Sequence, residues 1–248
     1  MRRRFFVDKF ENDSATLRGD TANHLARVLR AEPGQLYELS DGSTLWLARI
    51  DEVGLVSRGE NRVAFSLVEQ LAAPAPAAHI TLLLSLVKFD RFEWALEKAT
   101  ELGVAEIIPL AAERTDKPLV SAAEKRHERW VKILHESAQQ SRRLAPPKLA
   151  AEAMRSAKAF AAAHDSLKLM LSERHDAPSL RGTLTEPRHQ HALRATLAIG
   201  PEGGWTDSEL ESARAAGFAE ASLGDLILRT ETAVVAALAV VTFSLNAK

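Results

Sequence analysis

The stretch IGPEGGWT, residues 199–206, joins a short apolar run to the start of a helical pattern. The run before it, ATLAI at residues 195–199, is rich in strand formers. Thr206, with Glu209 three residues later, has the pattern of a capping box at a helix N-terminus. The three glycines between strand and helix allow a ligand to approach the main chain closely. The stretch therefore predicts a strand, a ligand-binding turn and a helix, although a Gly-Pro turn can also be a mere connection.

A second strand and turn follow directly. Residues 219–223 have the pattern of another buried strand, and the turn GDLILRTETA at residues 224–233 comes after it. Residues 233–245 then form a helical pattern that is apolar nearly all round, which is typical of a helix buried in a core or an interface. Two turns of this kind in succession favour a ligand site built from loops that follow strands.

The segment LAAPAPAA at residues 71–78 has the composition of a linker, because proline suits neither a helix interior nor a central strand. Upstream of it the patterns predict a helix at residues 20–30 and strands at residues 4–7, 35–39, 44–51 and 63–71. These elements indicate a small β-rich, barrel-like domain. Downstream, helical patterns alternate with apolar runs at residues 80–87, 107–110, 167–171, 196–199 and 221–223. That alternation predicts a mainly parallel α/β sheet, so we expect domains at residues 1–73 and 74–248.

The composition is that of an ordinary globular protein. With 248 residues, of which 46% are hydrophobic, the chain can bury normal cores. No apolar run reaches the length of a convincing membrane span, and no apolar segment of a secretory signal follows the basic residues 2–4. The absence of cysteine excludes disulfides and thiolate metal sites. We expect a cytoplasmic protein with neither a membrane nor a metal partner.

The formal net charge of −1 gives no overall indication of a nucleic-acid partner, but the charge is unevenly distributed. Residues 125–148 carry a net charge of +5, whereas residues 199–248 carry −4. The basic segment favours a local RNA-binding surface and is equally compatible with a solvated helix face.

Taken together, the motifs GPEGG at residues 200–204 and LRTETA at residues 228–233 resemble those of the SPOUT class of S-adenosylmethionine-dependent RNA methyltransferases. Within that class the chain is similar to the 16S rRNA uridine-N3 methyltransferase family. Further stretches are similar to family signatures in the family's order: NHLARVLR at 23–30, KFDRFEW at 88–94, KATELGV at 98–104, ER at 113–114 and RW at 129–130. Two stretches depart from the family pattern. QQSRR at 139–143 stands where the family has EQSGR, and GDL at 224–226 stands where it has GPR.

The resemblance implies a knotted, mainly parallel SPOUT-type α/β sheet preceded by a small PUA-like β-barrel domain. It also implies a homodimer with the cofactor pocket near its interface. The implied reaction is methyl transfer from S-adenosylmethionine to N3 of a uridine in 16S rRNA of the small ribosomal subunit, with uridine 1498 as the family target. A noncatalytic RNA-binding or ribosome-assembly protein of the same fold is an alternative, and so is a methyltransferase that acts on another RNA.

Residues of the turns and of the strands before them are expected to hold the cofactor, with main-chain groups around adenine and ribose and apolar side chains against the ring. Core packing explains the apolar members of this set equally well. The expected cofactor-binding residues are Leu171, Gly200, Pro201, Gly203, Gly204, Leu223, Gly224, Ile227, Leu228 and Ala233.

Uridine N3 carries an imide proton, so the uracil ring becomes anionic at or near the transition state. Arg229 is the expected electrostatic stabiliser of that anion. Glu231 is the candidate general base, although an acid in the first turn of a helix is also explained by the helix dipole. Basic residues that contact phosphates position an RNA without reading its sequence. The expected RNA contacts are Arg3, Arg4, His24, Arg27, Arg30, Lys88, Arg91, Arg142 and Arg143.

Overall fold

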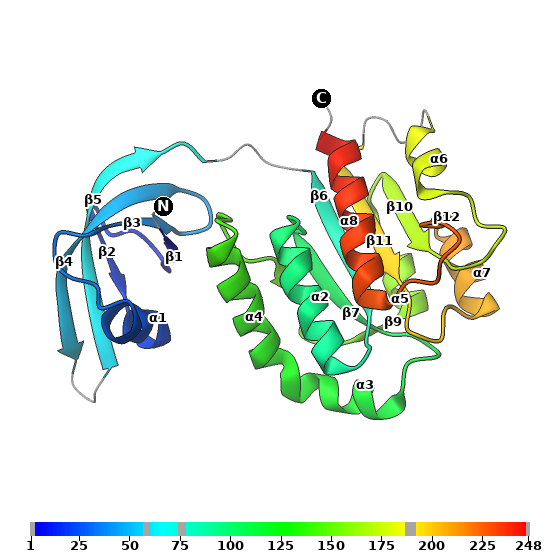
Figure 1. The fold of residues 1–248 in the computed structure, drawn as a ribbon, viewed down its shortest axis with the longest axis horizontal. Coiled ribbons are helices and arrows are strands. Elements are labelled where there is room, and N and C mark those ends of the chain that lie inside the picture. Colours follow the sequence, from blue (N-terminus) through cyan, green and yellow to red (C-terminus); the bar gives the residue numbers. More distant parts are fainter. Residues whose placement is uncertain (1–2, 57–59, 74–77, 187–191, 247–248) are drawn as a thin grey trace. The chain divides into compact units, whose positions relative to one another are not determined.

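The computed structural model describes residues 3–56, 60–73, 78–186 and 192–246, which form two units (Figure 1). The first unit comprises residues 1–75 together with 138–146, and the second comprises residues 76–137 and 147–248. The expected domains were residues 1–73 and 74–248, and the compact units differ from them in grouping residues 138–146 with the first unit. One reason is local: the Ser40 hydroxyl donates a hydrogen bond of 2.7 Å to the Leu144 carbonyl. Residues 74–77 of the expected linker lie outside the described residues.

The first unit is built on a curled mixed sheet. Its strands run in the order β1-β3-β4-β5-β2, with β1 parallel to β3 and the other pairs antiparallel. Leu25, Leu39 and Phe65 are buried at the centre of its core. The elements are β1 (Arg4–Phe6), β2 (Ser14–Leu17), α1 (Gly19–Asn23), the π-helix η1 (His24–Val28), β3 (Leu36–Ser40), β4 (Leu45–Val56) and β5 (Glu60–Leu71). The predicted helix at 20–30 is thus divided into an α-helical turn and a π-helical turn.

The second unit is an α/β domain whose sheet pairs are all parallel within the described residues, which confirms the predicted sheet type. The strand order is β12-β10-β11-β6-β7-β8, and β9 also pairs with β7. The strands are β6 (His79–Ser85), β7 (Glu106–Ala111), β8 (Lys148–Leu149), β9 (Met154–Arg155), β10 (Leu167–Leu171), β11 (Arg194–Ile199) and β12 (Ala219–Ala221). The helices are α2 (Phe89–Glu101), α3 (Lys117–Ala123), the 3-10 helix η2 (Glu124–Arg126), α4 (His127–Gln140), α5 (Ser156–Ala161), α6 (Leu180–Thr185), α7 (Asp207–Ala215) and α8 (Thr230–Asn246).

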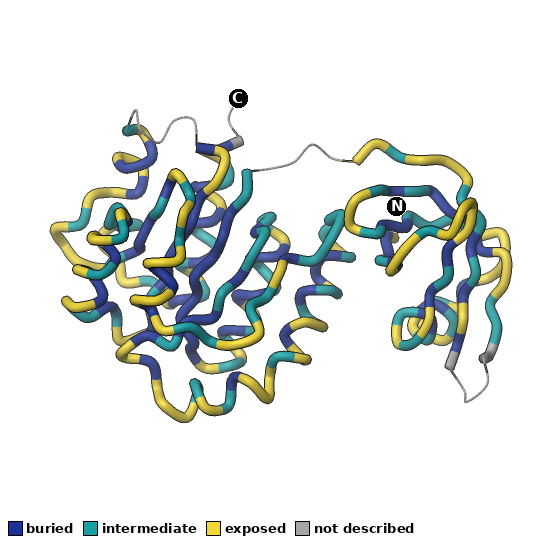
Figure 2. Tube along the Cα trace, turned by 180° about the vertical axis from the view of Figure 1, so that it is seen from behind, coloured by how far each residue is buried: buried dark blue, intermediate teal, exposed yellow. Residues whose placement is uncertain are grey.

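Helices cover both faces of this sheet, with α2, α4 and α8 on one face and α5 and α7 on the other (Figure 1). Successive side chains of a strand point to opposite faces. Accordingly, Leu82 and Leu84 of β6 join the core under the first group of helices, and Leu83 joins the core under the second. The central strands are buried along nearly their whole length (Figure 2). Burial on both faces explains why these strands are continuous apolar runs rather than alternating patterns.

The predicted capping box is present at the start of α7. The Thr206 hydroxyl accepts a hydrogen bond from the Glu209 main-chain N–H at 3.2 Å, and the Glu209 carboxylate accepts one from the Thr206 N–H at 3.0 Å. Helix α8 buries one side, for example Val234 and Leu238, while Phe243 on its other side is 77% exposed. No helix within the described residues combines the length and the apolar character that a membrane crossing requires.

Candidate functional site

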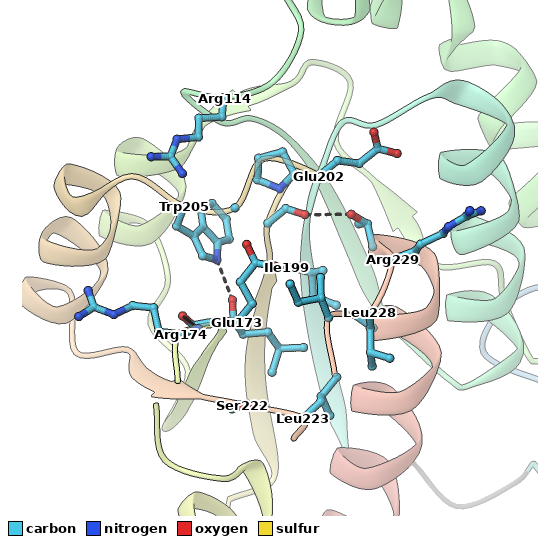
Figure 3. Close-up of a pocket in the computed structure, with 18 of the residues that line it drawn as sticks. Arg114, Glu173, Arg174, Ile199, Glu202, Trp205, Ser222, Leu223, Leu228 and Arg229 are labelled. Carbon is cyan, nitrogen blue, oxygen red and sulfur yellow. Dashed lines mark hydrogen bonds between the residues drawn. The ribbon is translucent and has the colours of Figure 1, made fainter. Parts of the chain in front are cut away.

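A cavity of about 670 Å³ lies where β10, β11 and β12 end (Figure 3). Its walls come from the loop after β10, from the Gly-rich loop after β11 and from the segment between β12 and α8. The last segment is fixed to the Gly-rich loop where α8 begins, because the Thr230 hydroxyl donates to the Gly200 carbonyl at 3.3 Å. This is the edge at which ligands bind in open α/β sheets. The predicted convergence of the loops after these strands is therefore present.

Most of the expected cofactor residues border this cavity: Leu171, Gly200, Pro201, Gly204, Leu223, Gly224, Ile227, Leu228 and Ala233. Gly203 does not line it; its carbonyl instead accepts a hydrogen bond of 2.8 Å from Arg114 Nη1. Ile227 is 79% exposed and Leu226 is 81% exposed. Core packing therefore does not account for Ile227, although it remains a sufficient account of the buried Leu171.

Trp205 lines the cavity and is not among the site residues predicted from the sequence. Its indole N–H donates to the Leu171 carbonyl at 2.8 Å, which joins the end of β10 to the Gly-rich loop (Figure 3). A Cβ atom on Gly200 would lie 3.0 Å from the Trp205 ring. Only glycine leaves the indole in place there, so the close approach explains this glycine.

Glu209 ties the Gly-rich loop to the loop after β7. Its side chain is buried, and besides capping α7 it accepts a hydrogen bond from the Glu113 main-chain N–H at 3.0 Å. The Glu113 carboxylate in turn accepts one from the Thr206 hydroxyl at 2.8 Å. The sequence pattern predicted the capping box between Thr206 and Glu209 but not the hydrogen bonds with Glu113.

The two candidate catalytic residues differ in their surroundings. Arg229 borders the cavity and is exposed, and Figure 3 shows its side chain directed away from the cavity floor. Glu231 is not among the lining residues. Its Oε1 lies 3.9 Å from Nε of Arg91, while its Oε2 is buried without a hydrogen-bond partner among the described residues. Arg91 lines the cavity and also pairs with Glu202.

The expected RNA contacts differ in how far they are exposed. Arg3, His24, Arg27, Arg30 and Lys88 are exposed, whereas Arg91, Arg142 and Arg143 are half-buried. Burial lowers the pKa of the Arg143 guanidinium. Arg2, which precedes this set in the basic run, lies outside the described residues.

Arg4 is 7% exposed, and its guanidinium donates to Glu38 at 2.9 and 3.1 Å and to the Arg142 carbonyl. Its partners are supplied by the parallel pairing of β1 with β3, which sets Arg4 opposite Glu38. A structural role accounts for Arg4 better than the expected phosphate contact does. Among the described residues no group of three or more His, Asp or Glu side chains is arranged to hold a metal ion.

Residues 73–242 match the family model described as RNA methyltransferase domain. The ribosomal RNA small subunit methyltransferase E of Synechocystis sp. is 34% identical over 228 residues, which cover 91% of this chain and 72% of that relative. The protein of the same name from Rickettsia conorii is 30% identical over 92% of this chain and 89% of its own length. A crystal structure of ribosomal RNA small subunit methyltransferase E from Neisseria gonorrhoeae, bound to S-adenosyl methionine, matches with a TM-score of 0.82 and 31% identity. The match covers 97% of this chain and 96% of the Neisseria gonorrhoeae chain.

Proposed function

The chain belongs to the RNA methyltransferase family of these ribosomal RNA small subunit methyltransferase E proteins, and we propose that it methylates N3 of a uridine in 16S rRNA with S-adenosylmethionine. The family indicated by the sequence motifs is thereby confirmed. The observation that carries the proposal is the cavity at the ends of β10, β11 and β12. We also propose that the reaction takes place in the cytoplasm, on RNA of the small ribosomal subunit.

The cavity suits an adenosyl ligand. Its volume of about 670 Å³ lies within the range of roughly 300–1,000 Å³ that is usual for small-molecule and cofactor sites. Main chain at Gly200 and Gly204 and apolar side chains at Leu223 and Leu228 supply the close approach and the flat apolar contacts that an adenosine needs. We assign cofactor binding to the nine expected residues that line the cavity. S-adenosylmethionine supplies the methyl group there.

Within this proposal, Arg229 and Glu231 act on the uridine. A guanidinium at the mouth of the cavity stabilises the negative charge that develops on O2 and O4 as N3 loses its proton. Glu231, whose buried Oε2 has no hydrogen-bond partner among the described residues, is the candidate acceptor of that proton. Arg91 pairs with Glu202 and lies 3.9 Å from Glu231, so it holds the Gly-rich loop and the start of α8 together. We therefore assign Arg91 to positioning as well as to the expected RNA contact.

We propose that the first unit binds RNA phosphates through its exposed basic side chains. Arg4 is excluded because it pairs within the fold. The remaining candidates are Arg3, His24, Arg27 and Arg30, together with Arg142 and Arg143 of the same unit. We also propose a homodimer formed through α8 and α2, which pack against each other. Both helices leave apolar side chains exposed: Phe243 by 77%, Trp94 by 43% and Val240 by 42%.

Isothermal titration calorimetry with S-adenosylmethionine and with S-adenosylhomocysteine tests the proposed cofactor. We expect both to bind the isolated protein with one site per chain. Gly200→Val should abolish the binding, because its side chain would meet the Trp205 ring, which lies 3.0 Å from the position of a Cβ. A wild-type protein that binds neither compound at millimolar concentration would instead point to a noncatalytic RNA-binding protein of the same fold.

A further inference from the structure

Two side chains of opposite charge, Glu173 and Arg114, lie beside Gly204 in the wall of the cavity. A Cβ atom at Gly204 would lie 2.8 Å from Oε1 of Glu173 and 4.0 Å from Nη1 of Arg114. Glu173 comes from the loop after β10, and Arg114 comes from the loop after β7. Both side chains line the cavity. Gly204 has a φ of +68°, so both its conformation and the carboxylate beside it require a residue without a side chain.

The charge of Glu173 is not balanced within the described protein. No ion pair or hydrogen bond to its carboxylate is found among the described residues, although Arg174 is its neighbour in sequence. Arg174 is instead bound to Asp176 through hydrogen bonds of 3.2 Å and lies 3.9 Å from Glu220. Arg114 directs Nη1 to the Gly203 carbonyl at 2.8 Å, which leaves the other N–H groups of its guanidinium available. The cavity thus offers one free acceptor and one partly free donor close together.

The apolar part of the cavity lies elsewhere. Figure 3 shows Leu223 and Leu228 on the opposite side of the cavity from Arg114 and Arg174. A ligand that fills the whole cavity should therefore be apolar and flat at one end. At the other end it should carry one positive and one negative group. An α-amino acid group has this second character, since its ammonium needs an acceptor and its carboxylate matches the planar donors of a guanidinium.

We propose that Glu173 and Arg114 form the subsite for the amino-acid tail of the cofactor, with Glu173 accepting from the α-ammonium and Arg114 donating to the α-carboxylate. This inference rests on the proposed function, because it presupposes that S-adenosylmethionine occupies the cavity. Under it, the apolar side holds the adenosine and the charged side distinguishes complete cofactors from adenosyl compounds without the tail.

A matched pair of ligands isolates this subsite. S-adenosylhomocysteine and 5′-methylthioadenosine both have a neutral sulfur and the same adenosine, but only the first has the amino-acid tail. We expect wild-type protein to bind S-adenosylhomocysteine more tightly. Glu173→Gln should reduce that preference by about tenfold, the equivalent of one hydrogen bond to a charged group, with 5′-methylthioadenosine unaffected. Glu211→Gln, which removes an exposed carboxylate from α7 outside the cavity, is the control and should leave both affinities unchanged.

The possible outcomes separate the inference from the proposed function. If the wild type binds both ligands and Glu173→Gln weakens both equally, or weakens neither, the tail does not contact Glu173 and the inference is wrong. If the wild type binds neither ligand, the proposed cofactor itself is wrong. Arg114→Gln gives a second arm of the test: it should also lower the preference for S-adenosylhomocysteine, and an unchanged preference would remove Arg114 from the subsite. Thermal unfolding of each variant checks that a reduced preference is not caused by unfolding.

Discussion

Replacement of Glu209 by alanine should both destabilise the protein and weaken cofactor binding. The buried Glu209 carboxylate accepts hydrogen bonds from the main-chain N–H groups of Glu113 and Thr206, each at 3.0 Å. Hydrogen bonds to charged groups contribute about 1.5–3 kcal/mol each. Because Glu113 is exposed, water can replace part of this stabilisation in the variant. We therefore expect a loss of about 3 kcal/mol rather than the full sum.

A loss of that size lowers Tm by roughly 6–12 °C in a domain of this length. Since Glu209 holds the Gly-rich loop against the loop after β7, the dissociation constant for S-adenosylmethionine should rise by about tenfold, or 1.4 kcal/mol. Circular dichroism melting and calorimetric titration measure the two effects. Glu211→Ala is the matched control on the exposed side of the same helix and should stay within about 0.5 kcal/mol of wild type. A Glu209→Ala protein with unchanged Tm and unchanged affinity would refute this account of the loop.

Three further predictions concern catalysis, backbone strain and RNA binding. Arg229→Ala should lower kcat by roughly 10²–10³ in a methyl-transfer assay with little change in cofactor affinity, and an unaltered kcat would exclude Arg229 from the reaction. Arg142 has a φ of +57°, a left-handed conformation that suits glycine, so Arg142→Gly should raise the free energy of unfolding by about 0.5–1 kcal/mol in urea titrations. A decrease would mean that the Arg142 side chain contributes more than the strain costs. Joint replacement of His24, Arg27 and Arg30 by alanine should make the salt dependence of RNA binding shallower, by roughly 0.7–0.9 in log–log slope for each phosphate that the protein no longer neutralises; an identical slope would place the RNA elsewhere.

The sequence was sufficient for the features that are local in the chain. Strand, turn and helix around residues 199–206 follow from an apolar run, glycines and a capping box, each within a few positions of the next. Parallel pairing followed from the alternation of strands and helices, and convergence of the loops followed from parallel pairing. By contrast, β2 (Ser14–Leu17) escaped prediction because only Ala15 and Leu17 of its four residues are apolar.

Features that depend on partners far along the chain were not predictable in this way. The hydrogen-bond partner of Trp205 is the Leu171 carbonyl, 34 residues away, and the second partner of Glu209 is Glu113, 96 residues away. In the sequence Arg4 has the character of a phosphate contact, whereas in the fold it lies opposite Glu38. Burial and pairing are properties of the folded chain, so a basic side chain in a sequence does not reveal whether its charge is already engaged.

Methylation of N3 of a uridine in 16S rRNA is the activity that we propose for this chain. In the most direct test, purified protein and S-adenosylmethionine are incubated with small ribosomal subunits from a strain that lacks this protein. The 16S rRNA nucleosides are then analysed by mass spectrometry. We predict that 3-methyluridine appears at one position in the presence of wild-type protein and is strongly reduced with Arg229→Ala. Absence of any methylation, or a methyl group on another atom or another nucleotide type, would contradict the account.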